Sequence, residues 1–157
     1  MTNVAKARLL VSAQFTLLGA IGLVALAHVD SKIHNYLIEE ALTIAAGFIV
    51  LIFAWHALRP SLQISPIPKE GAIFISRGIY QYVRHPMYLG VILVGFGIAG
   101  FADSLVSWIF EFLLIIVLNF KATFEDGLLR ETYPEAWHYQ SHTAKVFPCM
   151  SGACKTH

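Results

Sequence analysis

The chain has 157 residues, of which 57% are hydrophobic and 13% are charged, and its formal net charge at pH 7 is +1. The mean hydropathy is positive. This balance excludes an ordinary soluble domain of this length and is typical of an integral membrane protein.

Four apolar segments are long enough, or nearly long enough, to cross a bilayer. A span across a hydrocarbon core about 30 Å thick needs roughly 20 mostly apolar helical residues, and residues 9–27 and 38–58 meet this requirement. Residues 87–101 are apolar but short, and residues 105–120 continue the pattern after a break at Asp103. The sequence therefore predicts four transmembrane helices, with spans three and four forming a helical hairpin.

The first span is expected to remain in the protein, because no signal-peptide cleavage site follows it. Basic residues then set the orientation, since Lys and Arg concentrate on the cytoplasmic side of membrane proteins. Of the 11 Lys and Arg residues, all but Lys32 precede span one, lie between spans two and three, or follow span four. This pattern predicts a multi-pass protein with both termini in the cytoplasm, where the second loop and the C-terminal tail share one side.

The loop at residues 59–85 is rich in proline and glycine, so we expect turns rather than a long helix there. Pro86 suits the first turn of a helix, which places Arg84 and His85 at the start of span three. Free N–H groups and the helix dipole favour an anion at that position, and Arg84 adds a planar cationic fork. The tyrosines of this motif that could stack on a heteroaromatic ring are Tyr80, Tyr82 and Tyr88. Alternatively, these residues form an interfacial belt.

Span three also contains Gly95-Phe96-Gly97-Ile98-Ala99-Gly100, which formally matches the dinucleotide-binding pattern G-x-G-x-x-G. That fingerprint requires a preceding strand and a following helix in a βαβ unit, and an apolar span supplies neither. Small residues that let helices approach closely are the better interpretation.

Glu111 is a carboxylate inside the fourth span. Such a group costs about 2.5 to 3.5 kcal/mol on insertion scales, so it should face protein, water or a substrate tunnel, unless short spans place it near the outer interface. His56 and Asn119 lie near the cytoplasmic ends of spans two and four, where interhelical hydrogen bonding is the expected role.

The helix of span four is expected to continue beyond the membrane and to break at Tyr133-Pro134, because a proline disfavours helix in the residue before it. A short helix at about residues 135–142 should follow. Lys121 and Glu125 are one turn apart, positioned for an i, i+4 ion pair, and Asp126 is adjacent. A solvated ion pair is the simpler interpretation, but the proximity of the Arg-His-Pro segment on the same side favours a functional site.

Two cysteines, Cys149 and Cys154, form a lone C-x4-C near the C-terminus. This spacing lacks a second pair of ligands, so we expect no metal site.

These motifs resemble those of the isoprenylcysteine carboxyl methyltransferase and phospholipid methyltransferase superfamily of membrane enzymes. The segments that carry the resemblance are Gly78-Ile79-Tyr80, Arg84-His85-Pro86-Met87-Tyr88-Leu89-Gly90, Glu125-Asp126, and the tail residues Leu129, Tyr133-Pro134, Trp137 and Phe147-Pro148. The resemblance covers residues 65–148 and implies that S-adenosylmethionine is the cofactor, held between the second cytoplasmic loop and the tail.

The resemblance also implies roles for individual residues. Glu125 would hold the α-amino group of the cofactor, and Lys121 would help to position the substrate, so these two are the implied catalytic residues. The implied cofactor-binding residues are Tyr80, Arg84, His85, Pro86, Met87, Tyr88, Glu125 and Asp126. Lys121 replaces the arginine of the prenylcysteine branch, and lysine keeps the charge but lacks the bidentate geometry of arginine.

The sequence thus predicts an all-α integral membrane protein with one domain, residues 1–157. Within it we expect two N-terminal spans (1–64), a catalytic region (65–148) and a flexible tail (149–157). The expected function is S-adenosylmethionine-dependent methyl transfer to a lipophilic acceptor at the membrane surface. The group that receives the methyl would be the carboxylate of a prenylcysteine-like compound, a lipid amine or a thiol. The expected partners are membrane lipids and a lipophilic small-molecule or lipid substrate, with no nucleic acid.

Two alternatives remain at this point. One is a membrane reductase that uses a nicotinamide cofactor, because the C-terminal regions of sterol reductases resemble this helical arrangement. The other is a non-catalytic membrane module that scaffolds a partner or binds a lipid.

Overall fold

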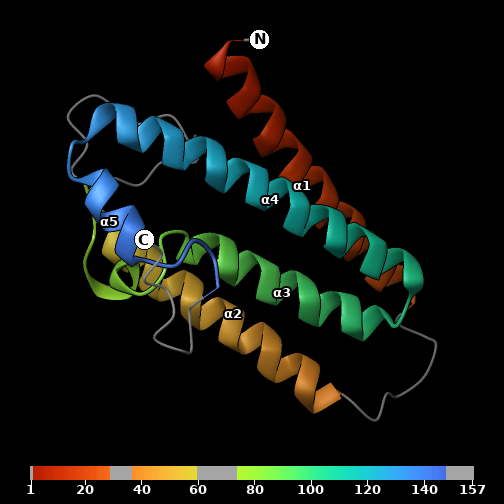
Figure 1. Cartoon of the computed structure of the whole chain (residues 1–157). Coiled ribbons are helices and arrows are strands. Elements are labelled where there is room, and N and C mark those ends of the chain that lie inside the picture. The colour runs from red at the N-terminus through yellow and green to blue at the C-terminus, as the bar shows by residue number, and fades with distance from the viewer. Residues whose placement is uncertain (1, 29–36, 60–73, 148–157) are drawn as a thin grey trace.

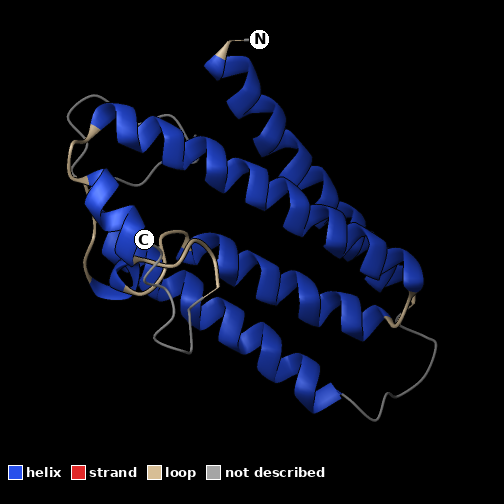
Figure 2. Cartoon of the chain, in the orientation of Figure 1, coloured by secondary structure: helices blue, strands red, loops and turns tan. Residues whose placement is uncertain are grey.

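The fold is all-helical in the ranges that the computed structural model describes, residues 2–28, 37–59 and 74–147 (Figures 1 and 2). In chain order the elements are α1 (Asn3–Ala27), α2 (Leu37–Leu58), the 3-10 helix η2 (Gly78–Gln81), α3 (Pro86–Ala102), α4 (Leu105–Thr132) and α5 (Ala136–His142). No strand occurs within these ranges, so the predicted all-α class is confirmed for them. The predicted turns at residues 60–73 and the cysteines Cys149 and Cys154 lie outside the described residues.

Three of the helices, α1, α2 and α4, are long and apolar enough to cross a membrane. Helix α3 is apolar but has only 17 residues, so the fourth span stays a prediction. The outer faces of the long helices expose large apolar side chains, including those of Leu23, Ile38 and Phe112. Apolar surfaces of this extent are unusual in soluble monomers and suit contact with lipid.

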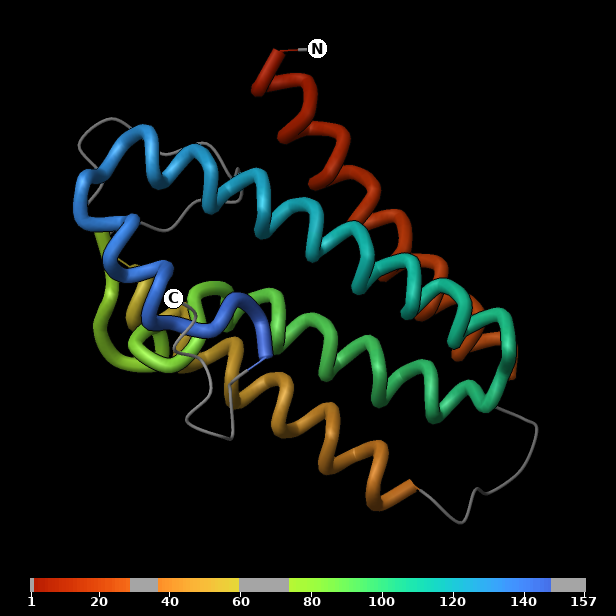
Figure 3. Tube along the Cα trace, in the orientation of Figure 1, coloured from red at the N-terminus to blue at the C-terminus, as the bar shows by residue number. Residues whose placement is uncertain are grey.

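Helices α3 and α4 form the centre of the molecule, with α2 packed against α3 and α1 packed against α4 (Figure 3). The chain reverses between α3 and α4 at Asp103 and Ser104. Asp103 has a φ of 42°, in the left-handed region, which aspartate tolerates better than most residues. This short reversal brings the first turn of α3 beside the last turns of α4.

The glycines of α3 allow close packing, as the sequence predicted. A Cβ on Gly97 would lie 2.9 Å from the carbonyl oxygen of Glu40 in α2, closer than real Cβ contacts allow. A Cβ on Gly95 would overlap the carboxyl group of Glu111 in α4. The G-x-G-x-x-G pattern is therefore explained by helix packing on two sides of α3.

The buried apolar core joins α1, α3, α4 and a segment that follows α5. It includes Ile21 from α1, Ile92 from α3, Leu114 and Leu118 from α4, and Val146. Val146 belongs to residues 143–147, which we call the C-terminal strap. The core therefore fixes this strap against the central hairpin.

Candidate functional site

The candidate site forms where the start of α3 meets the end of α4. His85 is the N-cap residue of α3 and Pro86 occupies its first turn, which confirms the predicted helix start. Helix α4 continues to Thr132, so Glu125 and Asp126 lie on a regular helical frame. The antiparallel arrangement of α3 and α4 then places His85 against these two acidic residues.

His85 lies between the two carboxylates. Its Nε2 atom is 2.9 Å from Asp126 Oδ1, and its Nδ1 atom is 3.5 Å from Glu125 Oε2. Burial alone would lower the pKa of His85, but its hydrogen bonds and the negative charges of Asp126 and Glu125 outweigh burial, so the pKa is raised. An imidazolium, which carries a proton on each nitrogen, suits two acidic partners.

Arg84 and His85 both contact the carboxylate of Asp126. The Nη1 atom of Arg84 is 3.1 Å from Asp126 Oδ2, so each oxygen of this carboxylate has a cationic partner. The Nε atom of Arg84 is buried and makes no hydrogen bond within the described residues. The guanidinium therefore retains a donor at the site.

Tyr88 connects the cluster to Glu125. Its hydroxyl donates a hydrogen bond of 2.6 Å to Glu125 Oε2, and its ring stacks on the imidazole of His85 with centroids 5.1 Å apart. The ammonium of Lys121 lies 5.0 Å from the centroid of the same ring, within the range of a cation–π interaction.

The predicted ion pair between Lys121 and Glu125 is wrong. The ammonium of Lys121 instead donates a hydrogen bond of 2.7 Å to Oε1 of Gln14 in α1, and no ion pair within 4.0 Å joins Lys121 to Glu125. The cause is tertiary packing: Lys121 is buried in the contact between α1 and α4, whereas the Glu125 carboxylate is held by His85 and Tyr88. The positive charge still lies near Glu125 and interacts with it through space.

The segments on either side of the site are joined by backbone hydrogen bonds. The N–H groups of Arg84 and His85 donate to the carbonyl oxygens of Ala144 and Lys145, at 2.8 and 3.0 Å. From α5, the Tyr139 hydroxyl donates to the carbonyl oxygen of Tyr80 at 2.5 Å. The C-terminal strap and α5 therefore lie beside η2 and the start of α3 (Figure 1).

Six of the sequence-predicted residues meet in one cluster: Arg84, His85, Tyr88, Lys121, Glu125 and Asp126. Tyr80 and Pro86 are buried beside it, and Met87 is half-buried in the first turn of α3. Burial, with a smaller effect from the charge of Glu125, raises the pKa of Tyr80, so this phenol stays protonated. Tyr82, also singled out in the motif, is 66% exposed.

Sequence reasoning missed three residues that organise the site, Gln14, Gln140 and Lys145. Gln14 could have been noticed as an amide inside an apolar span, a common sign of interhelical hydrogen bonding. Gln140 donates a hydrogen bond of 3.1 Å to the carbonyl oxygen of Asp126, and nothing in its local sequence predicts this contact.

The charges of the cluster suit a ligand that carries both an ammonium and a carboxylate. The Glu125 side chain is 26% exposed, so its carboxylate is accessible to an ammonium group. Arg84 offers its unused Nε–H to a carboxylate. The residues therefore fit the amino-acid portion of a cofactor such as S-adenosylmethionine.

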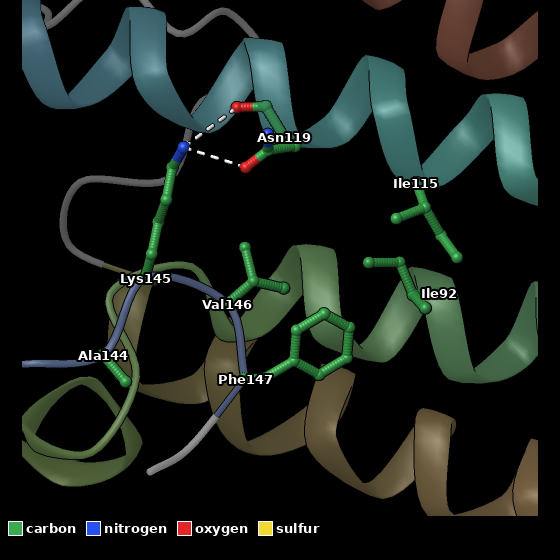
Figure 4. Close-up of a pocket in the computed structure, with 7 residues that line it drawn as sticks. All are labelled: Ile92, Ile115, Asn119, Ala144, Lys145, Val146 and Phe147. Atoms are coloured by element: carbon green, nitrogen blue, oxygen red, sulfur yellow. Dashed lines mark hydrogen bonds between the residues drawn. The ribbon is translucent and has the colours of Figure 1, made fainter. Parts of the chain in front are cut away.

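A cavity of about 340 Å³ lies beside this cluster, between α3, α4 and the C-terminal strap (Figure 4). The residues that line it are Ile92, Ile115, Asn119, Ala144, Lys145, Val146 and Phe147.

No group of three or more His, Cys, Asp or Glu side chains suited to a metal occurs among the described residues.

Comparison with known proteins gives one family match. Residues 41–136, which run from α2 to the first residue of α5, match the phospholipid methyltransferase family. No significant match was found among curated proteins or among solved structures. The matched residues include the whole charged cluster, whereas Gln14 and the C-terminal strap lie outside them.

Proposed function

The chain belongs to the phospholipid methyltransferase family, and from that premise we propose that it transfers a methyl group from S-adenosylmethionine to a lipophilic acceptor. The family and the three apolar helices indicate a membrane methyltransferase. The cofactor, the acceptor and the roles of individual residues are our proposal.

The observation that carries this proposal is the clustering of Arg84, His85, Tyr88 and Glu125 at the start of α3. Glu125 would hold the ammonium of the cofactor, and Arg84 Nε would donate a hydrogen bond to its carboxylate. Tyr88 fixes Glu125 through its hydroxyl. Asp126 binds both Arg84 and His85 and so holds the two cations in position.

Bound S-adenosylmethionine would supply a methyl group already activated by the sulfonium charge. The residues of the chain then need mainly to align the acceptor and exclude water. A carboxylate acceptor needs no base, whereas an amine or a thiol must lose a proton. Both nitrogens of His85 face carboxylates, so the imidazolium has no free nitrogen to accept this proton.

We also propose that α3 crosses the membrane as a fourth span and that both termini are cytoplasmic. The support is the distribution of basic residues, which places the second loop and the tail on the cytoplasmic side. In this orientation the charged cluster lies at the cytoplasmic surface and the cavity lies on its membrane side.

The direct experiment is calorimetric titration of the purified protein in detergent with S-adenosylmethionine. We expect binding by the parent and loss of binding in Glu125→Ala, because the ammonium would lose its partner. Glu131→Ala is the matched control, since Glu131 is exposed on the same helix and should leave binding unchanged. Failure to bind at millimolar cofactor, or tight binding of a nicotinamide nucleotide instead, would overturn the proposal.

A further inference from the structure

Helix α1 contributes one polar side chain beside the charged cluster. The buried side of α1 includes Ala7, Gln14 and Ile21, which follow one another at intervals of seven residues, and Gln14 is 8% exposed. A buried amide in an apolar helix contact costs free energy unless it is hydrogen-bonded. Gln14 is bonded through Oε1, which accepts a hydrogen bond of 2.7 Å from the ammonium of Lys121. Gln14 therefore fixes the position of one buried charge.

The ammonium of Lys121 has an alternative partner on its own helix. Glu125 follows Lys121 by one turn of α4, a spacing at which lysine and glutamate side chains can pair. In the structure the ammonium lies instead between Gln14 on α1 and the ring of Tyr88 on α3, whose centroid is 5.0 Å away. The hydrogen bond to Gln14 thus draws Lys121 away from an ion pair that the helix geometry allows.

The carboxylate of Glu125 gains from this arrangement. The Tyr88 hydroxyl at 2.6 Å and the His85 Nδ1 atom at 3.5 Å both contact Oε2, and neither contact occupies Oε1. The Glu125 side chain is 26% exposed, so an ammonium group of a ligand can reach it. An ammonium of Lys121 at the same carboxylate would compete with that ligand.

We infer that Gln14 is a positioning residue, which holds Lys121 away from Glu125 and so keeps the Glu125 carboxylate available to the ammonium of the cofactor. The effect on cofactor binding rests on the proposed function, whereas the placement of Lys121 does not. Gln14 acts through Lys121 and needs no contact with the cofactor. The site therefore extends to α1, which lies outside the residues that match the family, 41–136.

A purely structural role for Gln14 has different consequences. If Gln14 only satisfied a buried ammonium, its loss would lower stability and leave both the affinity for the cofactor and the separation of Lys121 from Glu125 unchanged. The two roles are therefore distinguished by where the ammonium goes when Gln14 is replaced, and by the binding that follows.

The first measurement uses the full-length protein in detergent and a water-soluble carbodiimide, which joins an amine to a carboxylate in contact with it and releases water. Mass spectrometry of peptides would detect the amide between Lys121 and Glu125. We expect Gln14→Leu to raise its yield roughly tenfold or more, since a hydrogen bond to a charged group is worth at least this factor. Ser12→Leu is the matched control, because Ser12 is exposed on the same helix and bonds only to the carbonyl oxygen of Leu9.

Gln14→Glu tests the acceptor itself. It retains an oxygen for the ammonium, so the cross-link should join Lys121 to position 14 and leave Glu125 free. Gln14→Met keeps the approximate shape of glutamine without its amide, and it replaces Gln14→Leu if that variant does not fold. Equal yields of the amide between Lys121 and Glu125 in the parent and in the apolar variant, whether high or absent, would overturn the inference.

The second measurement is calorimetric titration of the same proteins with S-adenosylmethionine. Gln14→Leu should weaken binding about two- to fivefold, the strength of exposed ion pairs, and Ser12→Leu and Gln14→Glu should not. In a Lys121→Met background, Gln14→Leu should have no further effect, because no ammonium is left to compete. If the parent binds and Gln14→Leu binds equally well, the inference fails and the proposed function stands. A parent that does not bind overturns the proposed function, and the cross-link still decides whether Gln14 positions Lys121.

Discussion

His85 and Asp126 form a buried hydrogen bond of 2.9 Å across 41 residues of sequence. The bond joins the start of α3 to the last turns of α4, and the second oxygen of Asp126 binds Arg84 at 3.1 Å. Because Glu125 is the neighbour of Asp126 and Tyr88 lies one turn after His85, this bond also sets the contact between Tyr88 and Glu125. The pair is therefore the support on which the candidate site depends.

The raised pKa of His85 predicts that the interaction between His85 and Asp126 weakens at high pH. Since the folded-state pKa lies above the unfolded value of about 6.5, the protonated form stabilises the fold fully below that value. The stabilisation should be lost as the pH rises through the folded-state pKa. Thermal unfolding in detergent, followed against pH, should show the parent approaching His85→Gln above about pH 6.5. Parallel profiles for the two proteins would contradict this.

Removal of the Asp126 carboxylate should be among the most destabilising changes at the site. Asp126→Ala leaves the charges of Arg84 and His85 buried without their main partner, and breaking a buried ion pair in this way costs about 3 to 5 kcal/mol. Glu131→Ala, at an exposed position on the same helix, should stay within about 0.5 kcal/mol of the parent. The measurement is the free energy of unfolding, and equal values for the two variants would show that Asp126 has no such role.

Lys121 and Gln14 should be energetically coupled. Gln14→Leu removes the hydrogen bond to a buried ammonium, so we expect a loss of about 1.5 to 3 kcal/mol. The same substitution in a Lys121→Met background should cost much less, because no buried charge is left without its acceptor. A double-mutant cycle measures this coupling, and additive losses would contradict it.

Features that depend on the local backbone were predicted from the sequence, whereas contacts between distant segments were missed. Pro86 at the start of α3 and the end of α4 before Pro134 depend on the local backbone, and the sequence predicted both. The partner predicted for Lys121 was wrong because i, i+4 spacing describes contacts within one helix, whereas Gln14 is 107 residues away in the sequence.

The meeting of the charged residues could be predicted from the sequence, whereas the cavity beside them could not. Its charged residues lie in two short motifs, so their meeting required only that α3 and α4 be antiparallel. The cavity depends on the C-terminal strap, whose Lys145 contacts α4 through tertiary packing alone. Spacing in the sequence gives no sign of such a contact. The resemblance implied only that the tail lies near the second cytoplasmic loop, and the cavity was not predicted.

Glu111 gives a further prediction, because it is 1% exposed and neither carboxyl oxygen has a hydrogen-bond partner within the described residues. The sequence left open whether this group faces protein or the outer interface, and the structure buries it against Gly95. Since its oxygens lack partners, an apolar side chain of similar shape should be tolerated. We expect Glu111→Leu to match or exceed the parent in stability, and a large loss would show that the carboxyl group has an essential partner.

Gly95 tests the same contact from α3. Gly95→Ala should cost about 1 to 3 kcal/mol, because its Cβ would overlap the Glu111 carboxyl in a packed interior. Gly22→Ala in α1 is the matched control, since a Cβ there meets nothing within 4 Å, and helix propensity favours alanine by about 1 kcal/mol. Adding Glu111→Ala to Gly95→Ala should recover most of the loss. If Gly95→Ala unfolds at the same temperature as Gly22→Ala, then α3 and α4 are not packed as closely here as this contact requires.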